Sequence, residues 1–327
     1  MPAILKRIAP KLGAKVILEP EHGFVGAVHF KNGKKSLFWD NKFDLNPVSS
    51  VKIAQDKGYT HFFLRQGGFK VPQELVVFAR TFHRHLVRPR GLASAVNFAR
   101  TLGYPVYVKA VRRSQGELVF RVGTKLELLN RLREIFKLDR MAIVQEVCAG
   151  RDYRLVVLDG EVISAYERRP LEVTGDGGHT VRQLLEAKQR DFVRAGRDTL
   201  IPWQDSRLRQ TLQTQGLTAQ SILPKGRRLP LLEVANLSLG GDTIDVTGKL
   251  NKSVARLAAH VAQHLCLRFC GVDVMMADAT MPLGDYRILE VNSAPGLDHY
   301  AYSGRRQKAL VDGLYLKVLQ AVQQGPS

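Results

Sequence analysis

GVDVMMADATMPLGDYRILEVN, residues 271–292, contains two apolar segments, GVDVMMA and YRILEVN, joined by a more polar connection over residues 278–285. Each segment has the length and apolar content of a β-strand, and the short connection predicts that the two strands pair as a hairpin. Side chains two residues apart on a strand share a face, so Glu290 and Asn292 point the same way. Asp273 interrupts the first strand, and the hairpin allows its side chain to converge with theirs.

Two carboxylates and an amide that converge at one point suit a metal–nucleotide site. Mg²⁺ binds few protein oxygens and completes its coordination with phosphate oxygens and water. The spacing leaves one alternative open, in which Asp273 and Glu290 pair with lysine or arginine at the surface of the sheet. The metal interpretation therefore depends on whether other parts of a nucleotide site are present.

A lysine at the end of another apolar strand is the first such part. Lys109 ends PVYVKA, and a basic, flexible-looking segment that includes Ser114 and Gly116 follows it. A lysine on a rigid strand beside a loop with free amide groups can clamp a polyphosphate, although a solvated lysine at a strand end is the alternative. The chain contains neither GxxxxGK[ST] nor GxGxxG, so a P-loop or a dinucleotide-binding site is not indicated.

The segment VQEVCAGRDYR, residues 144–154, runs from a strand into a hairpin that turns at Asp159-Gly160. A carboxylate such as Asp152 can hold ribose hydroxyls, and Arg154 can hold a phosphate through two hydrogen bonds. Arg168 closes the same hairpin, where a guanidinium balances negative charge that develops on an acyl phosphate. A place on the surface without such a role is the alternative for each.

The remaining patterns predict an α+β fold with a short β-rich piece at its start. The turn signal Asn32-Gly33 lies between two strand-like segments and predicts a type I′ hairpin. Apolar spacing and end signals predict further helices over residues 50–67, from Ser94 as N-cap to Gly103, near 125–137, after a capping box of Thr180 and Gln183, and over 253–267. A polar stretch that extends to about residue 229 is interpreted as an insertion.

Composition narrows the class of partner. The 327 residues are enough for two or three subdomains, and the net charge is +19, with 18 Lys and Arg against 6 Asp and Glu in residues 1–110. Such a field attracts polyanions or small anions such as nucleotides, and the lack of an aromatic-interleaved RNA motif argues against nucleic acid. No apolar run approaches the about 18 residues of a membrane span, and no signal peptide or disulfide framework is evident, so a cytoplasmic protein without a membrane partner is expected.

The order of these segments resembles the ATP-grasp superfamily, within it the branch of cyanophycin synthetases, ribosomal-protein glutamate ligases and the ligase part of bifunctional glutathione synthetases. The resemblance covers about residues 50–300. IAQDKGYT is similar to the DKxxT helix of that family, PVYVKA to its second lysine strand, RRSQGELVF to its lid and IVQEVCAGRDYR to its hinge. NLSLGGDTIDVT and ERRPLEVTGDGGHTVRQLL are similar to cyanophycin synthetase segments, and ILEVNSAPGL to the magnesium-binding end.

The resemblance implies a role for each matching residue. Those expected to bind ATP are Lys57, Lys109, the lid residues Ser114 and Gly116, Gln145, Glu146 and Val147 beside adenine, and Asp152 at the ribose. Those expected beside the reacting groups are Arg154, Arg168 and Asn236. Asp273, Glu290 and Asn292 would bind Mg²⁺, which Mn²⁺ could replace.

The implied architecture is two α+β lobes that hold ATP between antiparallel sheets. The expected parts are a short N-terminal substrate-side segment at 1–48, a linker with helices at 49–104, the small lobe and hinge at 105–170, and the large lobe at 171–327, with the metal site and a polar insertion near 187–229.

The implied activity is a carboxylate-amine ligation, in which the γ-phosphoryl group of ATP moves to a carboxylate and an amine then displaces phosphate. The expected partners are ATP and two small-molecule or peptide substrates, and a homo-oligomer is compatible with this activity. Two further hypotheses are a kinase-like ATP-grasp protein that forms no amide and a non-catalytic basic polyanion-binding protein on the same scaffold.

Overall fold

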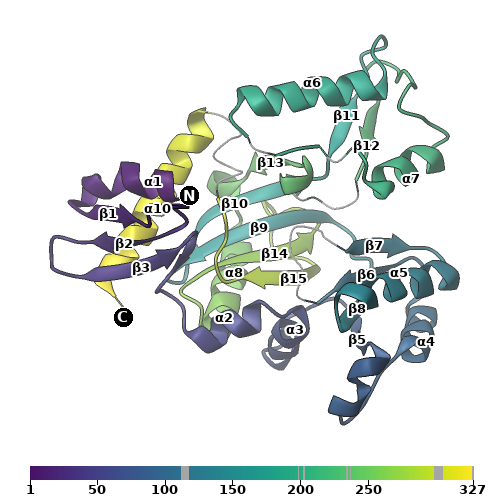
Figure 1. Cartoon of the computed structure of the whole chain (residues 1–327), viewed down its shortest axis with the longest axis horizontal. Helices are drawn as coiled ribbons and strands as arrows, with labels where there is room; N and C mark the ends of the chain where they lie inside the picture. Colours follow the sequence, from purple (N-terminus) through teal and green to yellow (C-terminus); the bar gives the residue numbers. More distant parts are fainter. Residues whose placement is uncertain are drawn as a thin grey trace.

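The computed structural model describes residues 1–111, 118–197, 199–201, 203–232, 235, 237–297 and 305–325. Within these ranges, a central five-stranded sheet lies between two four-stranded sheets, and a two-stranded ribbon lies apart from them (Figure 1). The described helices include none with both the length and the apolar character needed to cross a membrane.

The central sheet has the order β13-β10-β9-β14-β15 and is antiparallel throughout. Its strands are β9 (Arg151–Leu158), β10 (Glu161–Arg169), β13 (Asp242–Asp245), β14 (Phe269–Met276) and β15 (Tyr286–Asn292). The predicted hairpin is confirmed, and Asp273 on β14 lies directly opposite Glu290 on β15. Helix α8 (Lys252–His264) covers one face of the sheet. It ends three residues before the predicted 267, and Cys266 then adopts the left-handed conformation with a φ of 52°.

The small lobe is built on the sheet β5-β8-β6-β7, with helices α4 and α5 packed against it. Its elements are β5 (Glu74–Phe78), α4 (Leu92–Leu102), β6 (Val106–Ala110), β7 (Val119–Val122), α5 (Lys125–Leu138) and β8 (Met141–Glu146). β5, which precedes the predicted segment 105–170, pairs with β8, while β9 and β10, which lie within that segment, join the central sheet. Ser94 is not the N-cap of α4, since that helix begins two residues earlier, after Gly91.

The N-terminal unit packs with the end of the chain. Helix α1 (Pro2–Ile8), the 3-10 turn η1 (Ala9–Leu12) and strands β1 (Lys15–Leu18), β2 (Val25–His29), β3 (Lys35–Trp39) and β4 (Lys42–Phe43) share a core with α10 (Arg305–Gln324). This core includes Val156 and Phe269 of the central sheet, so the unit covers part of the face opposite α8. The hairpin at Asn32-Gly33 is confirmed, but its type I′ turn is wrong, because only Gly33 of the two has a positive φ.

The helix predicted over residues 50–67 is two helices, α2 (Val48–Ala54) and α3 (Lys57–Gln66). Asp56 separates them, because its carboxylate accepts hydrogen bonds from the backbone N–H groups of Gly58 and Tyr59 and so caps α3. This break places Lys57 in the first turn of α3, which packs against β15. An aspartate within a helical stretch was the available signal for the second start.

The region interpreted as a polar insertion has a core of its own. It contains β11 (Glu172–Thr174), α6 (Val181–Arg194), α7 (Ser206–Thr214) and β12 (Arg228–Pro230), around apolar side chains that begin at Leu171 and extend beyond residue 229 to Leu232. The capping box of Thr180 and Gln183 is confirmed at the start of α6. The 3-10 turns η2 (Arg80–His85), η3 (Leu237–Leu239) and η4 (Thr247–Lys249) complete the described elements.

Candidate active site

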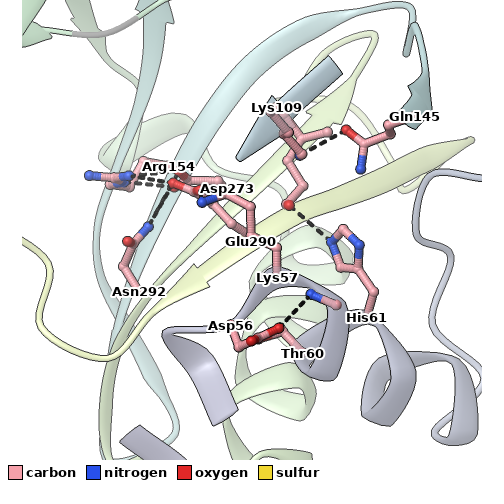
Figure 2. Close-up of polar contacts among 12 residues, drawn as sticks. Asp56, Lys57, Thr60, His61, Lys109, Gln145, Arg154, Asp273, Glu290 and Asn292 are labelled. Atoms are coloured by element: carbon pink, nitrogen blue, oxygen red, sulfur yellow. Dashed lines mark hydrogen bonds and ion pairs between the residues drawn. The ribbon is translucent and has the colours of Figure 1, made fainter. Parts of the chain in front are cut away.

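A cluster of charged side chains lies on the face of the central sheet that the N-terminal unit partly covers. Arg154 shares this face with Val156, and Asp273 shares it with Phe269, since residues two or four apart on a strand point the same way. Figure 2 shows the cluster with Lys57 of α3 and Lys109 of β6 beside it. The sheet therefore brings residues from distant parts of the chain to one place.

Asp273 is fully buried and is held by two arginines. Arg154 donates from Nε and Nη2 to the two carboxylate oxygens, at 2.6 Å each. The Nη2 atom of Arg168 lies 2.9 Å from Oδ2 of Asp273, and Arg168 also binds Asp152 at 2.7 Å. Asp152, the predicted ribose ligand, thus belongs to the same cluster.

Glu290 and Asn292 complete the predicted metal set. The Nζ atom of Lys57 lies 3.3 Å from Oε2 of Glu290, and the amide of Asn292 donates to Oε1 of Glu290 at 3.2 Å. The same amide nitrogen lies 3.5 Å from Oδ2 of Asp273 (Figure 2). The structure therefore brings the three predicted metal ligands together. It also contains ion pairs of Asp273 and Glu290 with arginine and lysine, which the sequence left open as the alternative to a metal site.

Burial and neighbouring charges shift the pKa values of Asp273 and Glu290 in opposite directions. Burial raises the pKa of Asp273, and Glu290 adds to this effect while Arg154 and Arg168 oppose it. Burial also acts to raise the pKa of Glu290, but Lys57, the contact with Asp273 and the two arginines outweigh it, so that pKa lies well below its usual range. Glu290 is therefore the more readily ionised member of the pair.

The donor set fits a hard cation such as Mg²⁺. Two carboxylates and one amide provide oxygen ligands, and Mg²⁺ usually takes few of these from the protein. Within the described ranges, no group of three or more His, Cys, Asp and Glu side chains is arranged to hold a metal ion. A metal here would therefore depend on Asn292 and on oxygens supplied by a nucleotide.

Lys109 is buried at the end of β6, and its Nζ atom donates to Oε1 of Gln145 at 2.9 Å. Burial, together with repulsion from Lys57, lowers the pKa of Lys109 to about 8. Two cations from different lobes thus lie close enough to repel each other. Such a pair favours the approach of an anion between them.

The other predicted nucleotide contacts differ in their surroundings. Gln145 is engaged with Lys109, whereas Glu146 points to Arg287, whose Nε atom lies 3.3 Å away, and Val147 is exposed. Their predicted places beside adenine stay predictions. The predicted residues Ser114, Gly116 and Asn236 lie outside the residues that the structure describes.

Sequence reasoning missed Glu74 and His61, which are connected to Lys109 through Gln145. Glu74 accepts a hydrogen bond from Gln145 at 2.9 Å and lies 2.8 Å from Nδ1 of His61. Glu74 fell in a segment assigned to a linker, and its apolar context, ELVVF, was the available signal for a strand. Nothing near it in the sequence indicates its partners.

Comparisons with known proteins find relatives of this chain by sequence. No protein-family model matches the chain. The glutathione biosynthesis bifunctional protein of Enterococcus faecalis is 31% identical over 284 residues, which are 83% of this chain and 36% of that protein. The cyanophycin synthetase of Crocosphaera subtropica is 31% identical over 260 residues, 76% of this chain and 28% of that protein. The chain thus spans about a third of the length of these relatives.

Solved structures agree on the fold. A bifunctional glutathione synthetase from Pasteurella multocida aligns with a TM-score of 0.61 at 22% identity, over 96% of this chain and 44% of that one. A D-alanine–D-alanine ligase from Bacillus anthracis aligns with a TM-score of 0.51 at 17% identity, over 85% of this chain and 69% of that one. Both identities are low, so these likenesses bear on the fold alone.

Proposed function

Because this chain belongs to the ATP-grasp family, we propose that it is an ATP-dependent ligase that joins a carboxylate to an amine through an acyl phosphate. One observation carries the proposal. Lys57, Lys109 and the group Asp273, Glu290 and Asn292 lie in one charged cluster that two antiparallel sheets contribute to. A protein that only binds polyanions has no need of such a set.

ATP would lie between the small-lobe sheet and the central sheet. Lys57 and Lys109 would bind its phosphates, with Ser114 and Gly116 over them. Gln145, Glu146 and Val147 would border adenine, and Asp152 would bind the ribose once it exchanges its contact with Arg168. Asp273, Glu290 and Asn292 would hold Mg²⁺ or Mn²⁺, and the metal would neutralise charge on the phosphates.

The protein residues would work by position and charge rather than by covalent chemistry. Arg154 and Arg168 already bind a buried carboxylate, that of Asp273, so their guanidinium groups have the geometry to receive a substrate carboxylate or an acyl phosphate. Asn236 would lie beside the transferred phosphate. A lid formed around Ser114 would keep water from the acyl phosphate, since hydrolysis would waste ATP.

The substrates are proposed to be an amino acid or short peptide that supplies the carboxylate and a second molecule that supplies the amine. The names of the relatives concern the biosynthesis of glutathione and the synthesis of cyanophycin. The surplus of basic residues is compatible with anionic substrates. A cytoplasmic location is part of this proposal.

A test of the reaction class separates the ligase from a kinase-like phosphotransferase. We expect steady release of ADP only when both a carboxylate and an amine are present, because the amine is needed to discharge the acyl phosphate. Release of ADP can be followed in a coupled assay while amino acids and dipeptides are screened in pairs. Steady ADP release with one substrate alone, together with a phosphorylated product, would support the kinase-like hypothesis instead.

Lys109→Ala is expected to weaken binding of Mg-ATP by about tenfold or more, because a charge-assisted contact to phosphate is lost. The ammonium is present below its pKa of about 8 and is lost above it. Wild-type affinity should therefore also fall by roughly tenfold between about pH 7 and about pH 9. Calorimetry at both pH values measures this, and the Ala variant, which lacks the titrating group, should show a flatter profile. An unchanged affinity in Lys109→Ala would count against this role.

A further inference from the structure

A chain of buried polar side chains runs from Lys109 to the edge of the central sheet. Lys109 donates to Oε1 of Gln145, and Nε2 of Gln145 donates to Oε2 of Glu74, both at 2.9 Å. Nδ1 of His61 lies 2.8 Å from the same Glu74 oxygen, and Nε2 of His61 lies 2.9 Å from the backbone carbonyl oxygen of Leu289. The active-site lysine is thus connected to β15, one residue before Glu290.

The four side chains that form this series of contacts are buried. The side chains of His61 and Glu74 are 0% and 2% exposed, and Lys109 and Gln145 are buried as well. A buried polar group that loses its partner cannot turn to solvent instead, so each contact constrains the next. The orientation of Gln145, and with it that of Lys109, therefore depends on Glu74.

The contact between His61 and Glu74 joins the two lobes. Glu74, Gln145 and Lys109 lie on β5, β8 and β6 of the small-lobe sheet. His61 lies on α3, one turn after Lys57, and it contacts the edge strand β15 of the central sheet. One buried pair therefore lies between the lysine of the small lobe and the lysine and carboxylate of the large lobe.

The two ring nitrogens of His61 have different partners. Burial acts to raise the pKa of Glu74, but His61, Lys109 and Arg65 outweigh it and lower that pKa, so Glu74 is a carboxylate. A backbone carbonyl can only accept, so we assign a hydrogen to Nε2 of His61. The other ring nitrogen, Nδ1, lies 2.8 Å from the carboxylate of Glu74, so the imidazole contacts β15 on one side and the small lobe on the other.

We propose that His61 and Glu74 are positioning residues that fix the position of the Lys109 side chain relative to Lys57 and Glu290 before ATP binds. The pair acts through Gln145 and does not touch the nucleotide. This inference rests on the proposed ATP site, because its effect is on the affinity for Mg-ATP. Preorganised cations bind phosphate more tightly, since no ordering is needed at the moment of binding.

Two substitutions of His61 separate its two contacts. The amide nitrogen of Gln can replace Nε2, so His61→Gln keeps the contact with Leu289 and loses that with Glu74. The amide nitrogen of Asn can replace Nδ1, so His61→Asn keeps the contact with Glu74. In calorimetry with Mg-ATP, we expect His61→Gln to lose about tenfold in affinity and His61→Asn to stay within about threefold. Circular dichroism establishes that both variants are folded.

A cycle with Lys109 gives a readout that a general loss of stability would not produce. Glu74→Ala should weaken Mg-ATP binding in the wild-type background but add little in Lys109→Ala, because Glu74 acts through that lysine. Glu134→Ala is the matched control, since Glu134 is a partly exposed glutamate on α5 of the same lobe that pairs with Arg131 at 2.7 Å, and its affinity should be unchanged. Because this cycle needs no His61 variant, it stands even if one of them fails to fold.

The outcomes are distinct. Equal affinities of the two His61 variants, or additive losses in the cycle, would overturn the positioning role while the proposed function stands. A wild-type chain that does not bind Mg-ATP would overturn the proposed function and this inference together. Loss in His61→Gln alone, with a cycle that is not additive, is the result that the inference predicts.

Discussion

Glu290→Ala is expected to reduce Mg-ATP turnover by at least about 10³-fold while the chain stays folded. Glu290 is the more readily ionised carboxylate of the cluster and contacts Lys57 and Asn292. Its loss would remove an oxygen ligand of the metal and the countercharge of an ATP lysine. Asp273 keeps Arg154 and Arg168, so the most buried charges remain paired. Release of ADP measures the first effect and circular dichroism the second.

The matched control is another carboxylate of the same hairpin. Asp285 lies just before β15, its side chain is 68% exposed, and it pairs with Lys70 at 2.7 Å. Asp285→Ala should turn over at the wild-type rate, because an exposed pair contributes little to the site or to stability. Wild-type ADP release from Glu290→Ala would contradict the assignment of the metal site.

Arg154→Ala is expected to destabilise the protein by about 3 kcal/mol and to abolish turnover. The guanidinium makes two short hydrogen bonds to Asp273, which is fully buried. Removal of this partner leaves a buried carboxylate with Arg168 as its remaining arginine, and such a charge is costly without full compensation. Denaturant unfolding, followed by circular dichroism, measures the change in free energy.

Two further variants identify the cause of that loss. Arg151→Ala removes an exposed arginine from the same strand, where it lies 3.5 Å from Asp278, and should change stability by less than about 1 kcal/mol. Asp273→Asn, added to Arg154→Ala, removes the unpaired charge and should restore part of the stability. A wild-type unfolding free energy in Arg154→Ala would contradict the role given to the buried pair.

Parts of the site that depend on neighbours along the chain could be predicted from the sequence. The hairpin that places Asp273 opposite Glu290 follows from two apolar segments and a short connection. The capping box at the start of α6 is equally local. The alternation of side chains on a strand then puts Glu290 and Asn292 on one face, where the structure has them in contact.

Parts that depend on distant pairing could not be predicted in this way. Glu74 and Gln145 are 71 residues apart, and His61 and Leu289 are 228 apart. Both contacts arise only when β5 pairs with β8 and α3 covers the edge of β15. The strand content of each sheet could not be predicted for the same reason, because the partners of β5 and β9 are not visible in local spacing.

The central claim, that ATP activates a carboxylate for attack by an amine, has a direct isotopic test. Once a productive pair of substrates is found, the carboxylate is labelled with ¹⁸O and the reaction is run with Mg-ATP and the amine. When the amine attacks the acyl phosphate, the bridging oxygen of the former carboxylate leaves with the phosphate. Mass spectrometry should then find one ¹⁸O in each phosphate released, together with the amide product. Unlabelled phosphate, or a phosphorylated product without an amide, would contradict the account.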